Sequence, residues 1–239
     1  MSITTQIKTQ NKEVYVNNMF TDIANKYDLL NNLMTFGLHK IWKKNVIKLA
    51  ISENNTLNNV IDLCCGTGDL ALITSKLLPN AKIVCVDNCQ TMLDIANNKF
   101  KNLNNITTLK SNIDEINWDP LSIDLITIGF GLRNLSNREN CITMAYRILK
   151  QNGVFACIDL GHPSNKLWKS IYYIFFFKIV PLLGEIFAKN KEAYSYLSSS
   201  LLSWYTQEEL STLLLKYGFK KAYYKNIMGG AIAIHIAIK

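Results

Sequence analysis

The sequence predicts an α/β fold built on a mostly parallel sheet. Between residues 59 and 160, short apolar runs alternate with helical segments of about ten residues, a pattern typical of βαβ units with right-handed crossovers. A chain of 239 residues that is 49% hydrophobic and 18% charged has enough apolar material for one well-packed domain. This composition excludes an intrinsically disordered protein.

The elements follow one another in three parts. Helices are expected at residues 15–27 and 39–51, where apolar residues recur at helical spacing. The alternating part contains strands at 59–63, 81–87, 106–110, 123–130 and 153–160. Helices at 70–78, 91–100 and 139–150 follow the first, second and fourth of these strands. The last third contains an apolar stretch at 167–187, two further helical segments, and an antiparallel pair at 218–226 and 229–239.

These parts divide a single domain, residues 1–239, into four segments. We predict a helical N-terminal cover over residues 1–55 and a ligand-binding α/β core over 56–160. A helical lid is expected over 161–205, followed by the last helix and the antiparallel strands over 206–239.

A glycine-rich turn joins the first strand to the next helix. Gly66 and Gly68 allow the backbone to turn tightly and to approach a ligand at the helix N-terminus. Asp87 ends the second strand 21 residues after Gly66, the spacing typical of a carboxylate that accepts both hydroxyls of a bound ribose. The pattern therefore predicts a nucleoside cofactor at the carboxyl ends of the strands.

Two cofactors compete for this turn. Residues 66–71 can be matched to the dinucleotide pattern G-x-G-x-x-G/A, although one such match is weak evidence. Asp62 lies four residues before Gly66, where it suits the charged amino-acid end of S-adenosylmethionine but would face the pyrophosphate of a dinucleotide. The terminal antiparallel pair also favours a methyltransferase sheet. We therefore predict S-adenosylmethionine, with NAD as the alternative.

Other residues receive roles from their places after the strands. Thr67 is expected to bind the methionine part, Asp87 the ribose, and Asn112 and Ile113 the adenine. Gly129 would leave room beside the reactive sulfonium. A helix cap is the structural alternative for Asp87, and a turn is the alternative for Asn112.

Three motifs resemble one enzyme family. Residues 27–42, YDLLNNLMTFGLHKIW, are similar to the N-terminal signature of the quinone-ring C-methyltransferases of ubiquinone and menaquinone synthesis. Residues 62–69 and 129–134 resemble the cofactor loop and fourth-strand motif of that family. The resemblance implies a class I, Rossmann-like, S-adenosylmethionine-dependent methyltransferase. The adjacent Cys64 and Cys65 and the short N-terminus look most like the cyanobacterial and plastid branch, which acts on 2-phytyl-1,4-naphthoquinone.

The reaction implied by this resemblance is methylation of a ring carbon of a prenylated naphthoquinol, either demethylphylloquinol or demethylmenaquinol. Loss of a phenolic proton makes the adjacent carbon nucleophilic. Arg133, after the fourth strand, is expected to stabilise the phenolate, and His162 or Asp159, after the fifth, to take the proton. For Arg133 the alternative is a salt bridge that holds its loop.

The remaining substrate residues come from the N-terminal and fourth-strand motifs. Tyr27 and Asp28 are expected either to line the substrate entrance or to cap a helix, and Asn134 to bind substrate. His235 alternates within an apolar strand and is expected in the sheet, while His39 is expected between the N-terminal helices.

Other functions stay open at this point. Benzoquinol methylation is the nearest alternative, and an RNA methyltransferase or a non-catalytic S-adenosylmethionine-binding adapter is more distant. The net charge of +8 indicates an anionic partner. Because residues 167–187 are apolar but interrupted by Lys169, Lys178 and Glu185, we interpret them as two amphipathic helices, either core helices or a lid that touches a membrane.

We therefore predict peripheral contact with an anionic membrane and no nucleic-acid partner, with a homo-oligomer left open. No metal is expected, since the six cysteines form no CxxC pair. The N-terminus shows no apolar signal segment, and the richness in Asn and Lys favours a plastid (the chloroplast stroma, at the membrane) if the gene is organellar, and otherwise a bacterial cytoplasm.

Overall fold

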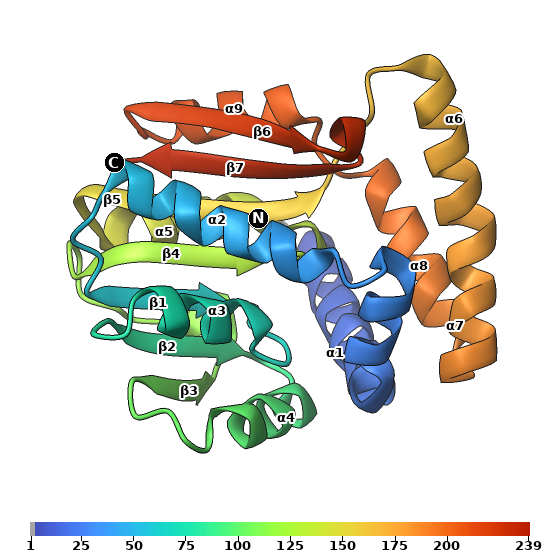
Figure 1. Ribbon diagram of the computed structural model, residues 1–239, viewed down its shortest axis with the longest axis horizontal. Helices are drawn as coiled ribbons and strands as arrows, with labels where there is room; N and C mark the ends of the chain where they lie inside the picture. Colours follow the sequence, from blue (N-terminus) through green and yellow to red (C-terminus); the bar gives the residue numbers. More distant parts are fainter. Residues whose placement is uncertain (1–2) are drawn as a thin grey trace.

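A seven-stranded sheet forms the centre of the protein, whose computed structural model describes residues 3–239 (Figure 1). The strand order is β3-β2-β1-β4-β5-β7-β6. Strands β1 to β5 are parallel, and β7 runs antiparallel to both β5 and β6. This arrangement confirms the predicted fold class. The strands are β1 Asn59–Leu63, β2 Lys82–Asp87, β3 Ile106–Lys110, β4 Ile123–Gly129, β5 Leu149–Leu160, β6 Lys221–Ile227 and β7 Ile232–Ile238.

Helices cover the sheet and extend beyond one of its edges. In Figure 1, α2 and α3 cross the near face of the sheet, while α1, α6, α7 and α8 gather beyond the carboxyl ends of the parallel strands. The helices are α1 Ile3–Thr35, α2 His39–Glu53, α3 Asp69–Leu77, α4 Gln90–Phe100, α5 Arg138–Ile148, α6 Lys166–Ile174, α7 Val180–Ala188, α8 Lys191–Leu202 and α9 Gln207–Lys216. Four shorter turns are η1 Ile113–Glu115, η2 Leu132–Asn134, η3 Phe175–Ile179 and η4 Met228–Gly230.

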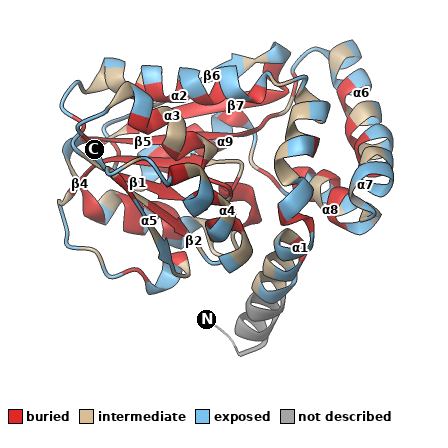
Figure 2. Ribbon diagram, turned by 60° about the horizontal axis from the view of Figure 1, so that its bottom comes forward, coloured by how far each residue is buried: buried red, intermediate tan, exposed pale blue. Residues whose placement is uncertain are grey.

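The central strands are buried on both faces. In β4, every residue from Ile123 to Ile128 is buried, as expected for a parallel strand with covering elements on each side. The buried sheet forms the red centre of Figure 2. A strand held this firmly fixes the positions of the loops at its carboxyl end, where ligands of open α/β sheets bind.

The apolar stretch at 167–187 differs from the prediction of two separate helices. Helix α6, the π-helical segment η3 and α7 follow one another without a break, so residues 166–187 form one helical run. Pro181, which has no N–H to donate, lies in the first turn of α7 directly after the π segment. By length and composition this run passes the test for a membrane-crossing helix, a test that core helices of soluble proteins also pass.

Two element boundaries also differ. Helix α1 continues to Thr35 instead of ending near residue 27, and β5 begins at Leu149, four residues before its predicted start. Leu149 pairs with Ile123 of β4 across an irregularity in the ladder. Propensity along the chain does not reveal such a pairing, because it depends on the neighbouring strand.

Candidate active site

Two neighbouring cavities lie at the carboxyl ends of the parallel strands. The first, which we call the loop cavity, is lined by residues that follow β1 to β4, including Gly66, Asp87, Asn112 and Gly129. The second, the apolar cavity, lies among α1, α2 and the helices from α6 to α8. Four residues line both cavities: Phe20, Tyr27, Phe130 and Asn134.

Asp87 and Gly66 form the wall of the loop cavity between β1 and β2. The Asp87 carboxylate accepts hydrogen bonds from the Gly66 N–H at 2.8 Å and the Cys89 N–H at 2.9 Å. Burial raises the pKa of Asp87, although these amides act to lower it. A carboxylate has about four lone-pair sites, so Asp87 can also accept from hydroxyl donors. Gly66 has a φ of +54°, and a Cβ there would meet no atom within 4 Å.

The strand-end residues therefore fit a nucleoside cofactor. Asn112 and Ile113 line the loop cavity after β3, as predicted for the adenine contacts. The Asn112 amide donates to Glu13 Oε2 at 3.1 Å, and its oxygen accepts from the Asp114 N–H at 3.3 Å, which caps η1. The structural alternative of a turn residue thus also holds for Asn112.

Gly129 lines the loop cavity, so its predicted place beside the sulfonium stays a prediction, and its lack of a side chain also has a packing reason. A Cβ at this position would lie 3.3 Å from Leu70 Cδ2 and 3.7 Å from Ile158 Cγ2. The glycine therefore makes room for packing of α3 against the sheet.

Thr67 and Gly68 lie outside both cavities. The Thr67 hydroxyl donates to Asp28 Oδ1 at 2.6 Å, so it is engaged by helix α1. Gly68 has a φ of +80°, and a Cβ there would lie 2.2 Å from the Phe100 ring. Both residues shape the loop, and the structure does not bring either one to the loop cavity.

Asp28 also lies outside the cavities, in an ion-pair network rather than at an entrance or a helix cap. Its carboxylate lies 2.6 Å from Lys99 Nζ, which also contacts Asp69 Oδ1 at 2.9 Å. Lys43 contacts the other Asp69 oxygen at 3.0 Å. Although burial acts to raise the pKa of Asp69, the two lysines lower it to about 2. The network ties α1, α2 and α4 to the first residue of α3.

Asp62 is buried in β1 beneath the loop. It accepts a hydrogen bond from Thr127 Oγ1 at 2.7 Å, because the β1–β4 register places the two residues side by side. Within the described part of the chain, its second oxygen has no hydrogen-bond partner. Burial raises the pKa of Asp62 to about 7. The residue lines neither cavity, so its predicted contact with the cofactor stays a prediction.

Arg133 and Asp159 form a buried ion pair. Arg133 lines the apolar cavity, and its Nε donates to Ser200 Oγ of α8 at 3.0 Å. Asp159 lines neither cavity and also accepts from the Leu160 N–H at 2.8 Å. The predicted salt-bridge alternative for Arg133 is thus present, together with its exposure to the apolar cavity.

His162 lies away from both cavities. Its Nδ1 is 3.2 Å from the Tyr173 hydroxyl and its Nε2 is 3.2 Å from the Trp204 carbonyl oxygen. Burial lowers its pKa. The structure therefore brings Arg133, Asn134 and Tyr27 together but leaves His162 apart. The other two histidines lie as expected, His235 buried in β7 and His39 buried on α2.

Three tyrosines of the apolar cavity were not predicted from the sequence. Tyr172, Tyr194 and Tyr196 line it, and their hydroxyls are buried with no hydrogen-bond partner among the described residues. Burial raises the pKa of each. The Asn134 amide oxygen, at the junction of the two cavities, is also buried with no hydrogen-bond partner among the described residues. A buried polar atom without a partner costs about 1–3 kcal/mol, so this set fits a ligand that carries oxygen atoms.

Comparison with known proteins identifies the family. Residues 8–239 match the model of the ubiE/COQ5 methyltransferase family. The ubiquinone/menaquinone biosynthesis C-methyltransferase UbiE of Rickettsia prowazekii is 36% identical over 235 residues, which cover 95% of this chain and 94% of that protein. The demethylmenaquinone methyltransferase of Staphylococcus carnosus is 32% identical over 233 residues, covering 97% and 96%.

Solved structures share the fold. The plantazolicin methyltransferase BpumL in complex with SAH has a TM-score of 0.65 at 15% identity and covers 99% of both chains. A SAM-dependent methyltransferase from Thermotoga maritima has a TM-score of 0.61 at 18% identity, covering 93% of this chain and 99% of that one. With the family match, these findings confirm S-adenosylmethionine as the cofactor rather than a dinucleotide. The chain belongs to the ubiE/COQ5 methyltransferase family and is an S-adenosylmethionine-dependent methyltransferase.

Proposed function

We propose that the protein methylates a ring carbon of a prenylated naphthoquinol. The observation that carries this proposal is the junction of the two cavities, where Tyr27, Phe130 and Asn134 line both. A cofactor in the loop cavity and a lipid-tailed ring in the apolar cavity would meet there. The names of the Rickettsia and Staphylococcus relatives support a quinone-type substrate.

The loop cavity supplies the residues that would hold the cofactor. Asp87 would accept the ribose hydroxyls, Asn112 and Ile113 would flank the adenine, and the Gly66 loop would approach the rest. When bound, S-adenosylmethionine supplies an electrophilic methyl group. Alignment of two reactants contributes about 7–11 kcal/mol in the best intramolecular models, which is the main work of these residues.

The apolar cavity supplies the residues for the quinol. Arg133 would stabilise the negative charge that develops on the phenolic oxygen, because a fixed cation is most effective in an environment of low polarity. Asn134 and the three tyrosines would hydrogen-bond the ring oxygens. Asp159 holds the guanidinium of Arg133 and would act as a positioning residue. Its alternative role as the base stays a prediction. The assignment of His162 as the base stays a prediction, and its two engaged ring nitrogens do not favour it.

The finer choices among substrates remain proposals. We favour naphthoquinol, and the name of the Rickettsia relative keeps benzoquinol as the alternative. The phylloquinone precursor and the plastid location stay predictions that rest on Cys64, Cys65 and the amino-acid composition.

A methyl-transfer assay tests the proposal. We expect label from S-adenosylmethionine to reach a reduced naphthoquinol faster than a benzoquinol with the same short tail, and to reach neither quinone in its oxidised form. The electron-rich quinol ring is required, so the oxidised quinones serve as the chemical control. Methylation of tRNA without methylation of either quinol would overturn the proposal.

A further inference from the structure

We propose that the outer face of α6, η3 and α7 docks on an anionic lipid bilayer and opens the apolar cavity toward it. The inference rests on the proposed function, since it names the surface through which a lipid-tailed substrate arrives.

An apolar stripe runs along the outer face of this helical run. Its residues have exposed fractions between 42% and 73%. Successive residues of the stripe are three or four positions apart within the α-helical parts. Across η3 they are five apart, which matches the i→i+5 hydrogen bonds of a π-helix. The π segment thus keeps the stripe on one side. The stripe comprises Leu167, Ile171, Ile174, Ile179, Leu182 and Ile186.

The opposite face of the same run is apolar as well. Tyr172, Phe176 and Val180 are buried, and all three line the apolar cavity. A surface helix of a water-soluble domain usually carries polar residues on its outer side. Figure 1 shows the run at the edge of the molecule, and Figure 2 shows exposed residues along it. The outer stripe therefore lacks a protein partner within the described chain, and exposed apolar patches of this kind mark interaction surfaces.

The charges around the stripe favour an anionic membrane over a second copy of the chain. Lys166, Lys169, Lys178 and Lys189 lie along residues 166–189, which contain one acidic residue, Glu185. Lysines beside an apolar face are typical of helices that lie in the headgroup region of anionic bilayers. Two copies packed face to face would instead bring these lysines near one another.

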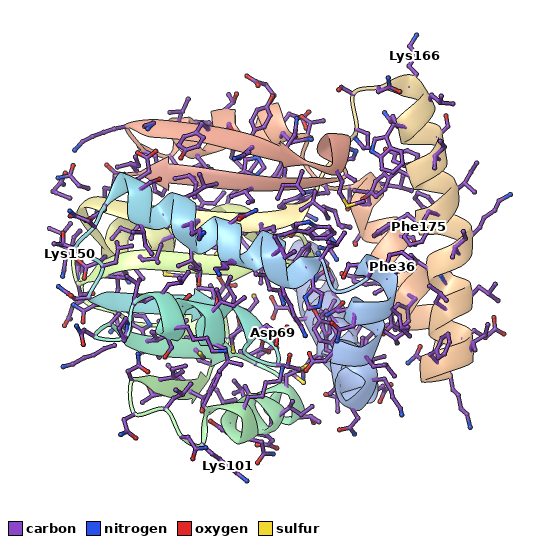
Figure 3. All side chains as sticks on the ribbon, in the orientation of Figure 1. Phe36, Asp69, Lys101, Lys150, Lys166 and Phe175 are labelled. Atoms are coloured by element: carbon purple, nitrogen blue, oxygen red, sulfur yellow. The ribbon has the colours of Figure 1, made fainter. Side chains whose placement is uncertain are left out.

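The apolar cavity reaches the surface beside this helical run. Among the residues that line the cavity, Phe36, Ile171 and Met228 are exposed, with Phe36 reaching 89%. Ile171 belongs to both the cavity lining and the stripe. Phe36 has a φ of +50° at the α1–α2 corner, a costly conformation for a bulky residue. Figure 3 labels Phe36 on this corner and Phe175 on the helical run beside it. A ring and its tail entering here would pass from lipid to cavity without crossing water.

Vesicle binding of the full chain tests the surface. We expect the double variant Ile174→Glu/Leu182→Glu to lower the partition coefficient on phosphatidylcholine–phosphatidylglycerol vesicles by about tenfold or more. The matched control Leu109→Glu/Leu215→Glu, at exposed sites on β3 and α9, leaves binding unchanged. Replacing Lys166 and Lys178 with Gln is expected to weaken binding to the mixed vesicles but not to phosphatidylcholine alone. Equal binding by both double variants would overturn the proposal.

Two further measurements separate this inference from the proposed function. Both double variants are expected to methylate a short-tailed quinol in solution at the wild-type rate, whereas only Ile174→Glu/Leu182→Glu loses activity on a long-tailed quinol in vesicles. If neither the wild type nor the variants methylate the short-tailed quinol, the proposed function is wrong. If the wild type methylates this quinol but does not bind vesicles, the docking surface is wrong. A smaller solution mass for Ile174→Glu/Leu182→Glu, with vesicle binding intact, would make the face a contact between copies and overturn the proposal.

Discussion

Arg133 donates to Asp159 in the interior of the protein, where the two side chains are 2% and 1% exposed. The pair joins the turn η2 after β4 to the end of β5, and Ser200 adds a contact from α8. The Arg133 guanidinium is thus held in place by contacts among η2, β5 and α8. Such a site needs little rearrangement when charge develops on a substrate.

Breaking this pair on one side is expected to cost about 3–5 kcal/mol of unfolding free energy, because the remaining charge is buried without compensation. Arg133→Met and Asp159→Leu should each show this loss in urea denaturation. The double variant should recover most of it while methyl transfer stays lost, since Arg133 faces the substrate cavity. Additive losses in the double variant would show that the two side chains are not coupled.

Asp87→Asn is expected to weaken S-adenosylmethionine binding by about 10- to 100-fold, since hydrogen bonds to a charged group contribute about 1.5–3 kcal/mol. The amide keeps the shape of the side chain but has one acceptor oxygen, so it can accept from only one of the Gly66 and Cys89 N–H groups. Urea denaturation of the same variant measures the stability lost in this way. Isothermal titration measures the effect. Asp94→Asn, on α4 and hydrogen-bonded to Gln90, is the control, and an equal affinity for both variants would contradict the ribose contact.

The two glycines of the loop are expected to respond differently to alanine. Both have positive φ, so each variant loses about 1–2 kcal/mol from the backbone. Gly68→Ala also forces a Cβ against Phe100 and lowers the melting temperature further, whereas at Gly66 the Cβ enters open space beside Asp87. Gly66→Ala should therefore lose mainly cofactor affinity. Thermal denaturation and titration of the same two samples separate these effects, and the reverse pattern would contradict the placement of the loop.

The sequence could predict the sheet and the strand-end part of the site because both depend on local patterns. Alternating apolar runs place β1 to β5, and the rule that ligands lie at the carboxyl ends of parallel strands then selects Gly66, Asp87 and Asn112. The same rule says nothing of which loop side chains turn away. Thr67 is directed to Asp28 of α1, 39 residues earlier in the chain, and this contact depends on how the N-terminal helix packs.

The tyrosines that the lid helices contribute to the apolar cavity were beyond prediction for a related reason. Tyr172 and Tyr194 lie on different helices. The residue pattern around each predicts a helix but does not indicate that both side chains line one cavity. Their shared cavity depends on the continuous run through η3, whose i→i+5 bonds no composition rule identifies. His162 follows a strand end as the rule requires, yet Tyr173 and Trp204 hold its ring elsewhere.

Protonation of the buried histidines is expected to lower the stability of the protein in acid, while Asp62, whose pKa burial raises to about 7, acts in the opposite direction. Burial lowers the pKa of His235 from 6.5 to about 4. Between these values the unfolded chain takes up a proton that the folded protein resists, so the free energy of unfolding falls as the pH falls through this window. At pH 5 the loss from His235 is about 2 kcal/mol. His235→Gln, whose amide can still donate to the Gln207 carbonyl, should lose less urea stability than the wild type when the pH falls from 7 to 5. The same pH dependence in both proteins would contradict this role of His235.

Tyr194→Phe separates binding of substrate from stability. The hydroxyl of Tyr194 is buried without a partner among the described residues, while its ring packs on Gly184. Removing the hydroxyl should leave the melting temperature unchanged or raise it, and should lower kcat/KM for the naphthoquinol by about two- to tenfold if the hydroxyl bonds the ring oxygen. Tyr223→Phe is the matched control: its hydroxyl donates to Glu53 at 2.8 Å and lies away from both cavities, so it should lose stability and keep its activity. A fall in kcat/KM for Tyr223→Phe as large as that for Tyr194→Phe would show that the Tyr194 hydroxyl has no particular role toward the quinol.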